Sequence, residues 1–171
     1  MASLMEELID TLEKENQEYE KLLALSMEKS GIIAARDIAN LEKITDEEQI
    51  VVTNINRLEA KRVSVTKDIA NVINKDVESL KLSYLVEIMG RQPQEQMRLA
   101  AIHDRLKDTV HRLKTINESN QKLIDQSLEM VQFDMNLLRS MRQAPQTANY
   151  GRNAVNSGAE LGAVRGFDAK Q

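Results

Sequence analysis

The chain has 171 residues with no cysteine, and 29% of its residues are charged while only 3% are aromatic. Its formal net charge of -4 argues against a nucleic-acid binder, which needs a concentrated basic surface, and the lack of cysteine excludes disulfides and thiolate metal sites. Few aromatic residues among many charged ones favour an all-α fold built around one core.

The first predicted element is a helix of about thirty residues. Ser3 and Glu6 have capping-box spacing and predict its start. Apolar residues then recur at spacings of three, four and seven, the pattern of one helical face. We expect this helix to end near Arg36, and Asp37 to cap a second helix that continues to about Val72. The two helices should form an antiparallel hairpin. Their apolar positions are Leu4, Leu8, Leu12, Tyr19, Leu22, Leu23 and Ile33, then Ile38, Leu41, Ile44, Val51, Val52, Ile55, Leu58, Val65, Ile69 and Val72.

After the hairpin the pattern loses phase around residues 74–76, and an apolar run from Leu80 to Met89 predicts one short connecting helix. Pro93 suits the first turn of a new helix, because its missing amide hydrogen has no helical partner there. About fifty residues to Arg142 contain no further proline or glycine, enough for roughly 75 Å of helix. The predicted fold is therefore all-α, an elongated antiparallel helical bundle with a two-helix hairpin, a short connecting helix and one long helix.

We expect the helical domain to span residues 1–142. Residues 143–171 hold four of the six glycines and are expected to be a flexible tail, disordered when free, in which Tyr150 and Phe167 stand out. The acidic amino terminus does not resemble a signal peptide, and no apolar stretch is long enough to span a bilayer. We therefore expect no membrane insertion.

The sequence contains no motif that predicts catalysis or a cofactor. It has no nucleotide-binding loop and no nucleophile elbow. His103 and His111 lie eight residues apart, about 80° apart around a helix, so they do not converge on one metal. We therefore predict a protein that is not an enzyme and uses no cofactor.

Three polar residues, Asn120, Ser127 and Asp134, recur every seven residues beside the apolar stripe of the long helix. A buried asparagine at such a position can fix the register of packed helices. Alternatively, all three lie at the edge of the stripe and stay hydrated. The sequence leaves both interpretations open.

The far end of the long helix is the main candidate for a functional surface. Its apolar stripe is broad and rich in methionine, whose flexible side chain adapts to different partners. For any single residue, core packing against the hairpin is the favoured interpretation, but two helices of about thirty-five residues need not cover a rod of fifty, and exposed apolar patches usually mark partner sites. The candidate residues are Leu123, Ile124, Met130, Val131, Leu137, Leu138 and Met141.

The order and spacing of several segments resemble those of the FlgN-type flagellar export chaperones of bacteria. The similarity covers most of the chain. The segments that carry it are residues 36–45 (RDIANLEKIT) with Glu48, 58–62 (LEAKR), 82–85 (LSYL) and 113–124 (LKTINESNQKLI) continuing to Phe133, with Tyr150-Gly151 and Gly166-Phe167-Asp168 in the tail.

The resemblance implies a cytoplasmic chaperone that binds hook-associated proteins, which form the hook-filament junction, and delivers them to the flagellar export gate protein. It implies that the client binds the far end of the long helix, at the seven residues from Leu123 to Met141 named above, and that a tail aromatic, Tyr150 or Phe167, contacts the gate. The alternative is a structural coiled-coil protein that self-associates without handling clients, and a homodimer is compatible with the sequence.

Overall fold

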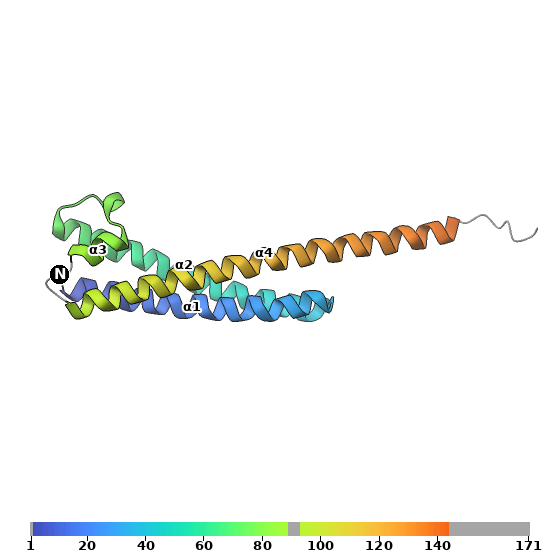
Figure 1. Cartoon of the computed structure of the whole chain (residues 1–171), viewed down its shortest axis with the longest axis horizontal. Helices are drawn as coiled ribbons and strands as arrows, with labels where there is room; N and C mark the ends of the chain where they lie inside the picture. Colours follow the sequence, from blue (N-terminus) through green and yellow to red (C-terminus); the bar gives the residue numbers. More distant parts are fainter. Residues whose placement is uncertain (1, 89–92, 144–171) are drawn as a thin grey trace, which may run out of the picture. The chain divides into compact units, whose positions relative to one another are not determined.

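The computed structural model describes residues 2–88 and 93–143, and every secondary-structure element among them is helical (Figure 1). The predicted all-α fold and its order of elements are confirmed. Tyr150 and Phe167 lie outside the described residues. The elements are α1 (Ala2–Ala34), α2 (Ile38–Ile73), the 3-10 helix η1 (Val77–Ser79), α3 (Leu82–Ile88) and α4 (Pro93–Gln143).

The chain divides into two compact units, residues 1–131 and 132–171. The first holds the hairpin, η1, α3 and most of α4, and the described part of the second is the last turns of α4, residues 132–143. The predicted domain boundary at residue 142 stays a prediction. Among the described residues, no helix combines the length and apolar character needed to cross a membrane.

The turn between α1 and α2 forms at the predicted place. Arg36 has a left-handed backbone with φ of 55°. Its amide donates to the Ile33 carbonyl at 3.0 Å and that of Asp37 to Ile32 at 3.2 Å, the Schellman pattern that ends a helix. The Asp37 carboxylate then accepts from the Asn40 amide at 3.1 Å and caps α2 as expected.

Helix α2 ends in the same way as α1. Asn74 has φ of 52°, its amide donates to Asn71, and the amide of Lys75 donates to the carbonyl of Ala70 at 3.0 Å. Asparagine tolerates this left-handed conformation better than arginine does, because its short polar side chain can bond locally.

Within the first unit, α1 and α4 run in the same direction and α2 runs against both (Figure 1). Arg98, near the start of α4, lies 3.2 Å from Glu6, 3.6 Å from Asp10 and 3.3 Å from Glu13, all near the start of α1. Further along both helices, Asn120 contacts residues of the second half of α1. The arrangement is an up-down-up bundle, with η1 and α3 in the connection between α2 and α4.

The main core lies at the end of this unit that holds α3. Leu85 of α3 is fully buried there against α1, the end of α2 and Leu99 of α4. The other buried members of the cluster are Met5, Leu8, Ile9, Leu12, Val65, Ile69, Ala70, Leu80 and Ile102. The sequence pattern missed Met5 and Ile9, which widen the buried face of α1.

Two residues assigned to the apolar positions of the hairpin are exposed, and those assignments were wrong. Ile38 and Val72, exposed by 72% and 56%, lie in the first and last turns of α2. Helical spacing alone does not report where a neighbouring helix stops covering a face.

A charged residue is buried in the middle of the hairpin. Glu15 is only 1% exposed, and its Oε2 lies 3.2 Å from Nε of Arg62 on α2. Burial raises the pKa of Glu15, and the attraction of Arg62 only partly opposes this effect. One turn away, the hydroxyl of Tyr19 donates to Glu59 at 3.1 Å, and burial together with this carboxylate raises the pKa of Tyr19 to about 12.

Candidate partner-binding surface

All described residues from 128 to 143 are exposed. Five of the seven predicted client-binding residues lie in this segment and are 45 to 67% exposed, whereas Leu123 and Ile124 are half-buried. The same segment contains Leu128, Phe133 and Met135, which are also exposed and which are not among the seven predicted client-binding residues. The five predicted and exposed residues are Met130, Val131, Leu137, Leu138 and Met141.

The apolar residues of this segment fall into two stripes, since each residue turns an α-helix by about 100°. The first stripe spans about 80° and the second about 40°, and their centres lie roughly 115° apart. Ser127 and Asp134 lie between them. The first stripe consists of Ile124, Leu128, Val131, Met135 and Leu138, and the second of Leu123, Met130, Leu137 and Met141.

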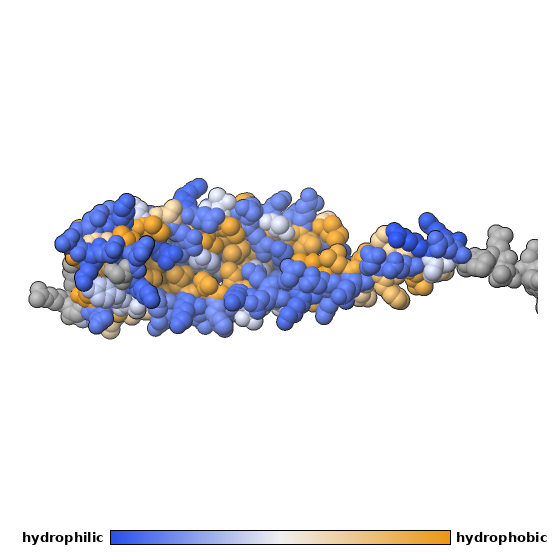
Figure 2. Space-filling view, turned by 90° about the horizontal axis from the view of Figure 1, so that it is seen from above, coloured by the Kyte–Doolittle hydropathy of each residue, from blue (hydrophilic) through white to orange (hydrophobic). Residues whose placement is uncertain are grey.

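The first stripe begins in a pocket at the turn end of the hairpin, which we call the hairpin-tip pocket. It has a volume of about 170 Å³ and lies wholly within the first unit. Figure 2 shows apolar surface at this end of the hairpin. Its apolar walls are Ile32, Ile33, Ile38 and Leu41 from the hairpin and Ile124, Leu128 and Val131 from α4, and Arg36, Asp37 and Ser127 complete the lining.

A layer of polar side chains fixes α4 against α1 just before the two stripes begin. Asn120 is 4% exposed, its Nδ2 donates to the Ser26 carbonyl at 2.8 Å, and its Oδ1 accepts from the Ser30 hydroxyl at 2.6 Å. Next to it, Lys29 and Glu48 form an ion pair at 2.6 Å between α1 and α2. A buried asparagine bonded to another helix favours one axial position of α4.

The other two members of the seven-residue series behave differently. Ser127 is half-buried and donates to the Leu123 carbonyl of its own helix at 2.8 Å, and Asp134 is exposed. The register interpretation therefore applies to Asn120, whereas the hydrated alternative applies to Asp134.

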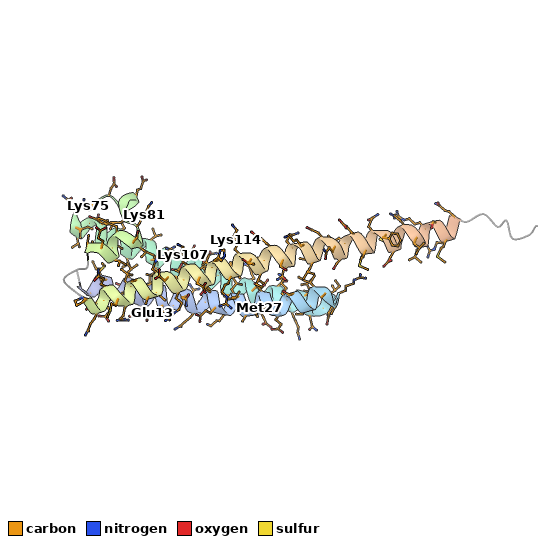
Figure 3. The ribbon with its side chains drawn as sticks, viewed as in Figure 1. Glu13, Met27, Lys75, Lys81, Lys107 and Lys114 are labelled. Atoms are coloured by element: carbon orange, nitrogen blue, oxygen red, sulfur yellow. The ribbon has the colours of Figure 1, made fainter. Side chains whose placement is uncertain are left out.

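A larger cavity of about 440 Å³ lies at the α3 end of the first unit. Arg62, Lys81 and His103 line it, but Arg62 already pairs with the buried Glu15. Figure 3 shows Lys81 on α3's side of the unit, and Lys107 on the side of α4 that faces away from α1. Among residues 2–88 and 93–143, no group of three or more histidines and carboxylates is placed to hold a metal ion.

Comparisons with known proteins give one family. The sequence model of the family described as FlgN protein matches residues 1–158. Among curated proteins, the chain is 29% identical over 120 residues to the β subunit of DNA-directed RNA polymerase from Mycoplasma capricolum; the match covers 67% of this chain but only 9% of that subunit. No solved structure matches the chain.

Proposed function

The chain belongs to the FlgN family of flagellar export chaperones, which are not enzymes, and we propose that it binds hook-associated proteins through the far end of α4. In this proposal it acts in the cytoplasm, prevents its clients from assembling early and delivers them to the export gate. Tyr150 or Phe167 of the tail would contact the gate protein; both lie outside the described residues.

The exposed apolar stripes of α4 support this proposal best. Isolated apolar side chains are normal on a protein surface, but here eight large ones lie exposed between Leu128 and Met141. An amphipathic client helix that lies along α4 would cover those of the two stripes with apolar side chains at spacings of three, four and seven. The surface therefore suits a segment that becomes helical as it binds.

The expected affinity is moderate. Covering a large apolar side chain that is half exposed contributes roughly 1 kcal/mol, about half of the value for full burial. Folding a disordered client segment onto the surface costs about 2–5 kcal/mol, and association itself costs more. A complex that is stable but not very tight suits a chaperone that must release its client at the gate.

Isothermal titration calorimetry of the whole chain with a hook-associated protein encoded in the same genome tests the surface. Leu137→Asp and Leu138→Asp should each weaken binding at least tenfold, because they place a charge in an apolar contact. Asn136→Asp is the matched control, since it adds the same charge on the polar side of α4, about 160° around the helix from Leu138 and 100° from Leu137, and it should bind like wild type. If both leucine variants keep the wild-type affinity, the proposed surface is wrong.

The same stripes would also suit the alternative, a structural coiled-coil protein that pairs through α4. That function predicts a stable oligomer without any client, and it predicts that Leu137→Asp makes the chain monomeric. Light scattering of the chain alone and with a hook-associated protein separates the two functions, because a chaperone gains the mass of its client.

A further inference from the structure

The hairpin-tip pocket has two properties that the open stripes lack: it is partly enclosed and it carries a charge at its rim. We propose that this pocket anchors one bulky apolar side chain of the client helix, and that Arg36 pairs with an acidic residue of the client close to that anchor. This inference rests on the proposed chaperone function and specifies the chemistry of the segment that the surface recognises.

The size of the pocket fits one side chain. Sites for small molecules usually have volumes of about 300–1,000 Å³. The hairpin-tip pocket has about 170 Å³, close to the roughly 150 Å³ of an apolar cavity that holds one benzene molecule. A leucine or phenylalanine side chain therefore fits, whereas a cofactor does not.

The walls of the pocket remain exposed without such a side chain. Ile38 is 72% and Leu128 is 62% exposed, although both line an apolar hollow whose floor includes the buried Ile33. An apolar side chain that enters between α4 and the start of α2 would remove both residues from water. Ile124, Leu128 and Val131 line the pocket and also belong to the first stripe, so a client helix that covers these residues can insert an anchor here.

The charge at the rim comes from Arg36. Its guanidinium donates to Sδ of Met130 at 2.8 Å, and a thioether is a weak acceptor. The neighbouring carboxylate of Asp37 is occupied, because it accepts from the amide of Asn40 at 3.1 Å and from its side chain at 2.6 Å. Among the described residues, no carboxylate lies within ion-pair distance of Arg36.

Arg36 also occupies a position that would suit glycine better. Its φ of 55° is in the left-handed region, where the β-carbon of any side chain is unfavourable and glycine is the usual residue. The position therefore keeps a cationic side chain at a conformational cost, directly beside an apolar pocket. Together these features suit a helical segment with an acidic residue three or four positions from a bulky apolar one, the spacing that places both on one face.

The test compares two glycine substitutions in the whole chain. Arg36→Gly and Asn74→Gly both relieve a left-handed residue at the end of a helix, so both should raise the melting temperature or leave it unchanged. Only Arg36→Gly should weaken binding of the hook-associated protein, by about five- to thirtyfold at low salt and less at high salt. Changing acidic residues of the client segment to amides should weaken binding to wild type but not to Arg36→Gly.

A second pair of variants tests the pocket. Ser127→Phe places an aromatic ring of the chain itself in the pocket, and Ser127→Leu fills a smaller part of the pocket. Each variant that folds like wild type by circular dichroism should bind the hook-associated protein at least tenfold more weakly. If these variants and Arg36→Gly bind like wild type while Leu137→Asp does not, the pocket proposal is overturned and the α4 surface stands. If wild type binds no hook-associated protein, both proposals are overturned.

Discussion

Replacing Asn120 with alanine tests whether the polar layer stabilises the docking of α4 on α1. The substitution removes two hydrogen bonds, one to the Ser26 carbonyl and one from the Ser30 hydroxyl. Neither partner is left without an alternative. The Ser26 carbonyl still takes part in α1, and the Ser30 hydroxyl lies 3.3 Å from that same carbonyl.

The size of the effect follows from these contacts. Each lost hydrogen bond contributes about 0.5–1.5 kcal/mol net, and no buried group is stranded, so the loss should be about 1–3 kcal/mol. Alanine is a better helix former than asparagine and returns up to about 0.7 kcal/mol. Asn117→Ala, on the exposed face of the same helix, gains the same helix propensity without losing the buried hydrogen bonds. The difference in unfolding free energy between the two variants should therefore be about 1–3 kcal/mol.

Urea unfolding followed by circular dichroism measures this difference, with Ser30→Ala added to give a double-mutant cycle. The cycle should show a coupling of at least about 0.5 kcal/mol between Asn120 and Ser30, as residues joined by a buried hydrogen bond do. Equal stabilities of Asn120→Ala and Asn117→Ala would refute the reasoning, because they would mean that the polar layer contributes nothing to packing.

Three further substitutions test the bundle. Because burial raises the pKa of Glu15 above 4.5 in the folded state, wild type should lose stability as pH rises from 4.5 through that raised pKa. Glu15→Gln should not lose stability over this range, so its urea midpoint should rise relative to that of wild type between pH 4.5 and pH 7.5. A difference between the two midpoints that does not change with pH would contradict the raised pKa of Glu15. Asp37→Ala should cost about 0.5–2 kcal/mol in thermal unfolding by removing the α2 cap, with Asp37→Asn close to wild type. Leu99→Ala, at a fully buried site, should cost about 2–5 kcal/mol, whereas Ile50→Ala, 64% exposed, should change stability by less than about 0.5 kcal/mol.

Local chemistry in the sequence predicted the helix boundaries well. The capping carboxylate of Asp37, the loss of phase near Asn74 and the fixed φ of Pro93 each depend on a few neighbouring residues, and each boundary lies where expected. The difference in helix lengths also allowed an exposed end of α4, with a core covered by the hairpin as the alternative. These features can be predicted from the sequence because they do not depend on which helices pack against each other.

Features formed where three helices meet could not be predicted from the sequence. The sequence could not decide whether Asn120 is buried, since its partners Ser26 and Ser30 are some ninety residues away. The hairpin-tip pocket escaped notice because it combines α4 with the ends of α1 and α2. The left-handed backbone of Arg36 could not be predicted, because a positive φ at a residue other than glycine appears only in the folded backbone.

The short turn between α1 and α2 has a consequence for how the chain is made. The hairpin is complete once Ile73 leaves the ribosome. The part of α4 that packs on it, up to Leu113, follows about 40 residues later, at a synthesis rate of roughly 5–20 residues per second. For about 2–8 seconds of synthesis the apolar side of the hairpin has no cover. A member of this chaperone family therefore exposes an apolar surface of its own while it is being synthesised.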